Sequence, residues 1–92
     1  MGKYHTGLEM LEERNMMAIL LALDQRGPLL KTEIYRAVSA NASMAIKIDM
    51  LEDAGIIAMA KDDRRYRLTD EGRIIAGDLI RLRDHLLRAA MH

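Results

Sequence analysis

The chain has 92 residues, half of them apolar, which is enough for one small domain with a hydrophobic core. Its 14 basic and 14 acidic residues balance, so the net charge gives no argument for a nucleic-acid partner. It contains no cysteine, which excludes disulfides and thiolate metal sites and is compatible with a reducing compartment.

Membrane insertion is not expected from the sequence. The longest apolar run, Met16 to Leu23, has eight residues, whereas a membrane-spanning helix needs about 20. No signal peptide is visible at the start of the chain. We therefore expect a soluble, cytoplasmic protein.

The first predicted element is a long helix over about residues 8–25. Thr6 and Glu9 have the spacing of a capping box. Apolar residues then recur at helical intervals as far as Leu23. The Gly-Pro pair at 27–28 ends the helix, since proline lacks the N–H that a continuing helix would use.

Two shorter helices are predicted next. Thr32 is a plausible cap for the first, whose apolar stripe consists of Ile34, Ala37 and Val38. Residues 39–41 have the composition of a turn. The other, which is the third helix of the chain, runs over about 42–54 and stops at Gly55. Its inward face carries Met44, Ile48 and Leu51, spaced i, i+4 and i+7.

A β-hairpin and a final helix complete the predicted elements. Residues 56–60 and 65–68 are short strand-like runs joined by the charged turn 61–64. Thr69 then caps a last helix, with acidic residues in its first turn, where the helix dipole favours them. That helix can reach about Ala90, a length of roughly 30 Å at 1.5 Å per residue.

Two motifs flank the predicted hairpin. Leu51-Glu52-Asp53-Ala54-Gly55-Ile56-Ile57 precedes it, and Leu68-Thr69-Asp70-Glu71-Gly72 follows it. In this order the chain resembles the winged helix-turn-helix domains of bacterial and archaeal transcription regulators, namely the MarR- and PadR-like group and their small archaeal relatives. The resemblance covers about residues 14–75. It implies an α+β fold, mostly α, with a three-helix core, a two-stranded wing and a long C-terminal helix in one domain over 1–92.

The resemblance implies that the wing touches the DNA backbone or the minor groove. If Tyr66 and Leu68 point to the core, strand alternation turns Arg65 and Arg67 outward. The basic patch then consists of these two arginines with Lys61 and Arg64. The alternative is a solvated hairpin in which the aspartates at 62–63 pair with the arginines.

The third helix, which the resemblance places in the major groove, is a poor reader of bases. Its outward arc is expected to hold Ala42, Ile46, Asp49, Met50 and Asp53, with Ser43 and Lys47 on one flank. Base edges are read by Arg, Lys, Asn and Gln, so only Asn41, Ser43 and Lys47 can donate usefully.

Two further features bear on partners. Lys31, Thr32 and Arg36 flank the second helix, which in the resembling proteins crosses the DNA backbone; for Thr32 a capping role is the competing interpretation.

Apolar residues in the last helix recur at heptad-like spacing, and residues 71–91 are expected to make a homodimer. The expected dimer residues are Ile75, Leu79, Leu82 and Leu86.

No enzyme chemistry is expected. The three histidines, His5, His85 and His92, have no metal-binding spacing, and no phosphate loop or nucleophile–base pair is present. We expect no cofactor and no metal.

Two functional hypotheses remain open. The first is a homodimeric transcription regulator that binds double-stranded DNA. The second is a winged-helix module that binds a protein through the apolar side chains of Ile46 and Met50.

Overall fold

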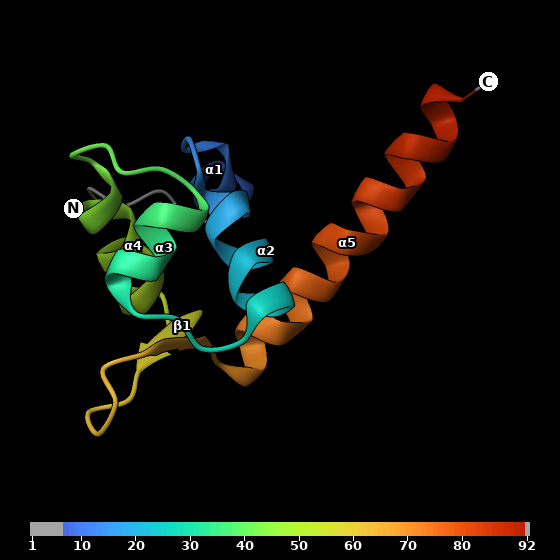
Figure 1. Ribbon diagram of the computed structural model, residues 1–92. Coiled ribbons are helices and arrows are strands. Elements are labelled where there is room, and N and C mark those ends of the chain that lie inside the picture. Colours follow the sequence, from blue (N-terminus) through green and yellow to red (C-terminus); the bar gives the residue numbers. More distant parts are fainter. Residues whose placement is uncertain (1–6, 92) are drawn as a thin grey trace.

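The computed structural model describes residues 7–91. They form an α+β fold, mostly helical, with one two-stranded antiparallel sheet (Figure 1). In chain order the elements are α1 (Leu8–Glu12), α2 (Met16–Arg26), α3 (Lys31–Ala37), α4 (Met44–Asp53), β1 (Ile57–Met59), β2 (Tyr66–Leu68) and α5 (Asp70–Ala90). Among these residues no helix combines the length and the apolar content needed to cross a membrane.

The core is organised around α2, which packs against α1, α3, β2 and α5. α2 is apolar over most of its length, and its residues Met16, Ile19, Leu20 and Leu23 recur at helical spacing to form the buried face, while Met17 stays exposed. Burying a side chain of this size contributes about 1.5–3 kcal/mol. The largest fully buried side chains are Met16, Ile19, Leu20, Ile34, Met44, Ile48, Leu51 and Ile57.

The predicted single helix over 8–25 is wrong, because the structure divides it into α1 and α2. Asn15 has φ 73°, in the left-handed region that interrupts a helix and that asparagine tolerates better than most residues. The predicted end is confirmed, since the Gly27 N–H closes α2 by donating to the Leu23 carbonyl at 3.0 Å. Thr6, the predicted first cap, lies outside the described residues.

The start of α3 also differs from the prediction. Leu30, rather than Thr32, is the residue before the helix, and its N–H donates to Glu33 Oε1 at 2.8 Å. Thr32 lies in the first turn with its side chain exposed. The Glu33 carboxylate, rather than the Thr32 hydroxyl, therefore caps the start of α3 by accepting the Leu30 N–H.

The positions predicted for α4 and the hairpin agree with the structure. Gly55 has φ 76°, which lets the chain leave α4 and enter β1. β1 pairs with β2 in antiparallel register, Ile57 opposite Leu68. A further contact was not predicted: the Leu29 N–H and the Tyr66 N–H each donate to the other residue's carbonyl, at 3.0 and 2.7 Å. The second strand is therefore hydrogen-bonded on both of its edges.

α5 begins and ends as predicted. Thr69 Oγ1 accepts a hydrogen bond from the Gly72 N–H at 3.1 Å, and two acidic residues occupy the first turn. The helix starts against α2 and β2 and then extends away from the rest of the protein (Figure 1). Only its first part is covered, because Gly72 and Ala76 are its buried residues.

Candidate nucleic-acid interface

The hairpin is held against the start of α3 by an ion pair. Arg65 Nη1 lies 2.8 Å from Glu33 Oε1, and both side chains are about one third exposed. The hydrogen bond from the Leu30 N–H, followed by the charge of Arg65, lowers the pKa of Glu33 below its ordinary value. Together with the Leu29–Tyr66 bridge, this pair fixes the hairpin beside α3.

The hairpin loop is ordered by the carboxylate of Asp63. It accepts the Arg65 N–H at 3.0 Å and the Arg67 guanidinium at 3.0 and 3.1 Å. The first of these bonds, then the contact with Arg67, lowers the pKa of Asp63. Arg64 between them has φ 60°, a left-handed conformation that turns the chain back toward β2. The loop therefore makes this turn at Arg64, where glycine would be the usual residue, and leaves the Arg64 side chain exposed.

The structure brings three of the predicted DNA-binding residues together. Lys31, Thr32 and Arg64 line a hollow of about 310 Å³ between the start of α3 and the hairpin, which we call the α3–hairpin hollow. The remaining wall is formed by Leu30, Met59 and Tyr66. Lys61 is exposed in the adjoining loop. Two cations and a hydroxyl at one opening can bind an anionic oxygen.

A second hollow on α3 holds two further basic side chains. Arg26, at the end of α2, lines it together with Leu29, Glu33 and Arg36, in a volume of about 230 Å³. Arg36 was placed beside α3 in the sequence analysis, whereas Arg26 was missed. No local signal could have found Arg26, because only the chain reversal after Gly27 brings it near α3.

Arg65 and Arg67 are each held in an ion pair, one with α3 and one within the hairpin. Arg65 pairs with Glu33 and Arg67 with Asp63, and Arg67 Nε is buried without a hydrogen-bond partner. The pairing alternative for the aspartates is therefore confirmed for Asp63, while Asp62 instead accepts the Asp63 N–H. Ion pairs this exposed contribute about 0–1 kcal/mol, so a phosphate can compete for either arginine.

Asn41 and Ser43 do not join this basic surface. Asn41 Oδ1 accepts the Ser43 N–H at 3.0 Å and the Ser43 hydroxyl at 2.7 Å, so the two side chains build the turn before α4. The hairpin follows the other end of α4 (Figure 1). Ten helical residues separate these ends by about 15 Å. These two residues can therefore only make a separate contact.

The outward face predicted for the third helix is wrong at two positions. Met50 and Lys47 are each only 8% exposed, so neither side chain is presented to a partner. The buried arc of α4 extends past Ile48 and Leu51 to include them, because the helix is covered on a wider side than one stripe requires. Its exposed residues are Ile46, Asp49, Glu52 and Asp53.

The residues predicted for dimerisation divide into two groups. Ile75 and Leu79 are half-buried and pack against the core. Leu82 and Leu86 are 52% and 61% exposed. The first pair therefore already has neighbours within the chain, and the second pair lies on the part of α5 that extends away from it.

No protein-family model, curated protein or solved structure matches the chain. The candidate interface is therefore inferred from the positions and charges of this chain's own residues.

Proposed function

We propose that the protein is a cytoplasmic, homodimeric DNA-binding regulator of the winged-helix type, whose hairpin and α3 start contact the phosphates of duplex DNA. The observation that carries this proposal is the α3–hairpin hollow, where Lys31, Thr32 and Arg64 meet at one opening. Lysine and arginine that neutralise phosphates release counterions, which supplies most sequence-independent affinity.

The surroundings of the hollow support the same ligand. Lys61 adds positive charge in the hairpin loop, and Arg36 adds it on α3. The Thr32 hydroxyl can donate to a phosphate oxygen, as its exposure allows. Arg65 lies beside the start of α3 and can exchange Glu33 for a phosphate at little cost, since that ion pair is exposed. Arg67 lines a separate hollow with Pro28 and Arg73, so it adds a charge apart from this opening.

The composition of α4 limits what such a protein reads. Its exposed residues include three carboxylates and no base. Carboxylates are repelled by phosphate, and the Arg, Lys, Asn and Gln side chains that read base edges are missing from this helix surface. We therefore propose backbone-dominated binding with little discrimination among sequences, in which Asn41 and Ser43 can add only a separate contact at the start of α4.

The protein-interaction alternative has less support. It required Ile46 and Met50 on one outer face, and Met50 is buried. Ile46 alone is 61% exposed. Single exposed apolar residues are common on soluble proteins and do not form a docking patch.

Fluorescence anisotropy of a labelled mixed-sequence duplex tests the proposal. The wild type should bind at low salt and lose affinity steeply as salt rises from about 50 to 200 mM. Lys31→Ala and Arg64→Ala should weaken binding and reduce the log–log salt slope by about 0.9 per contact removed. Arg88→Ala removes the same charge from the far end of α5 and should change nothing. Equal effects of all three variants would overturn the proposal.

A further inference from the structure

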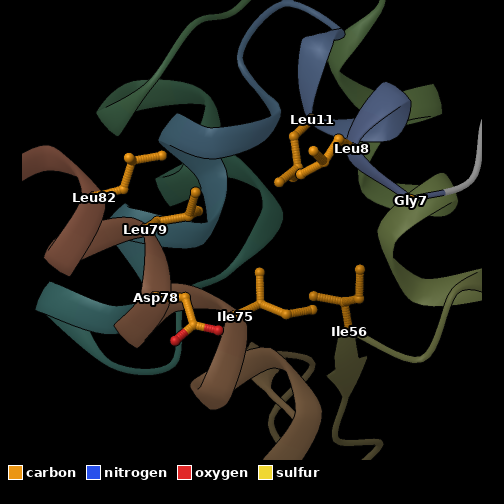
Figure 2. A pocket seen from close by; sticks show the side chains of 8 residues that line it. All are labelled: Gly7, Leu8, Leu11, Ile56, Ile75, Asp78, Leu79 and Leu82. Atoms are coloured by element: carbon orange, nitrogen blue, oxygen red, sulfur yellow. The ribbon is translucent and has the colours of Figure 1, made fainter.

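An apolar groove lies between α1 and α5, on a different surface from the α3–hairpin hollow. Figure 2 shows Leu8 and Leu11 of α1 on one side and Ile75 and Leu79 of α5 on the other. The volume is about 450 Å³, and Gly7, Ile56, Asp78 and Leu82 complete the lining. Asp78 is the one charged residue in this lining, and its carboxylate pairs with Arg81. We call this feature the α1–α5 groove.

The apolar wall of the groove continues along the free end of α5. At 100° per residue, Ile75, Leu79, Leu82 and Leu86 fall within one narrow arc of the helix. Leu82 closes the groove and is half exposed, and Leu86 beyond it is 61% exposed. Only alanines follow on that side, at 89 and 90. A single stripe thus forms the groove wall first and an uncovered helix surface afterwards.

We infer that the α1–α5 groove is filled by the free end of α5 from a second copy of this chain, in an antiparallel, two-fold symmetric helix pair. The groove flanks residues 75–82, and the free end spans 82–91, so both begin at Leu82. Their lengths match, at about 10 and 13 Å along the helix axis. A two-fold axis beside Leu82 sets each free end into the other copy's groove.

The two halves of the contact are complementary in chemistry as well as length. The groove offers leucine and isoleucine side chains, and the free end offers leucine and alanine. Because a two-fold contact is made twice, each copy contributes both a groove and a helix end toward the roughly 800 Å² per partner of a typical stable interface. A parallel pairing is disfavoured because it joins the free ends to each other and leaves both grooves open.

The inference rests on the dimer in the proposed function, yet it stands apart from DNA contact. The groove-lining residues and the hollow-lining residues share no member. Loss of dimerisation therefore tests this inference, and loss of binding in Lys31→Ala and Arg64→Ala tests the other.

Light scattering after size exclusion measures the oligomer. The wild type should elute at about 21 kDa, twice the chain mass of 10.5 kDa. Leu86→Glu should give the monomer mass, because it places a charge inside the partner's groove. Ile74→Glu is the matched control, since Ile74 is equally exposed, at 58%, on the same helix but off the stripe; it should remain dimeric. Circular dichroism of both variants checks that the fold is kept.

Cysteine cross-linking measures the direction of the pair, and the chain has no cysteine of its own. Disulfides need Cα atoms within about 7 Å. Leu82→Cys, near the axis, should cross-link under mild oxidation. Ala89→Cys should not, because an antiparallel pair holds the two positions about 21 Å apart.

Three results would overturn the inference. They are a monomeric wild type, a dimer that survives Leu86→Glu, and efficient cross-linking of Ala89→Cys. A monomer would leave the groove open to a small apolar molecule, and cross-linking at 89 would indicate the parallel pair.

Discussion

Arg65 Nη1 lies 2.8 Å from Glu33 Oε1, and the same carboxylate oxygen accepts the Leu30 N–H at 2.8 Å. One carboxylate therefore caps α3 and holds the hairpin beside it. The contact links residues 32 positions apart in the chain, so it contributes to the shape of the α3–hairpin hollow as well as to stability.

Glu33→Gln should destabilise the protein at neutral pH. Because the folded state lowers the pKa of this carboxyl, its contribution is present above the ordinary glutamate pKa of about 4.3 and is lost as pH falls through the lower folded value. Urea denaturation should therefore separate variant and wild type at pH 7, and the difference should shrink as the pH falls below about 4.3. A difference that stays constant as the pH falls would contradict this role. Glu12→Gln, on exposed α1, is the control.

The same variant should bind DNA more tightly than the wild type. Removing Glu33 deletes a negative charge beside the hollow and frees the Arg65 guanidinium for phosphate. We expect a several-fold gain in affinity at low salt and a steeper salt slope, measured by anisotropy. Weaker binding would mean that the position of the hairpin matters more than the freed charge. Glu12→Gln should leave both the affinity and the slope at the wild-type value.

Gly72→Ala should destabilise the fold strongly. A Cβ at this position would lie 2.1 Å from the Ile56 carbonyl oxygen, a backbone atom that also accepts the Thr69 N–H. We expect a loss of about 2–3 kcal/mol from overpacking. Gly77→Ala in the same helix has no atom closer than 3.9 Å and should gain about 1 kcal/mol from helix propensity. Thermal unfolding of both measures the contrast, and equal Tm values would refute it.

Met50→Ala and Ile46→Ala test the orientation of α4. Met50 is 8% exposed and Ile46 is 61% exposed. Truncating a buried methionine costs about 2–5 kcal/mol, although the lower end applies near the surface. The exposed Ile46 should change stability by less than about 0.5 kcal/mol. Denaturant midpoints decide the matter, and the reverse order would restore the outward placement of Met50.

Local signals in the sequence predicted the elements whose ends depend on a few adjacent atoms. Thr69 caps α5 through a hydrogen bond to a residue three positions on, and Gly55 leaves α4 through its own positive φ. The break at Asn15 was missed because apolar residues continue at helical spacing on both sides of it. Nothing in the periodicity marks a single left-handed residue.

The site was less predictable because it depends on tertiary contacts. The hairpin was predicted, yet its partner Glu33 was not, since their ion pair joins separate segments. Lys47 and Met50 were placed outward from a three-residue inward stripe, and such a stripe does not say how wide the covered side is. Lys31, Thr32 and Arg64 were each predicted separately, and they meet because the Leu29–Tyr66 bridge and the Arg65–Glu33 ion pair hold the hairpin beside α3.

The most direct test of the central claim is a titration of the ¹⁵N-labelled protein with a short duplex, followed by amide chemical shifts. DNA contact at the hollow predicts the largest shifts at Lys31, Thr32 and the loop residues 61–65, with small shifts at Asp49 and Asp53 on the acidic face of α4. No shifts at low salt, or shifts confined to α4 or to the free end of α5, would contradict the account.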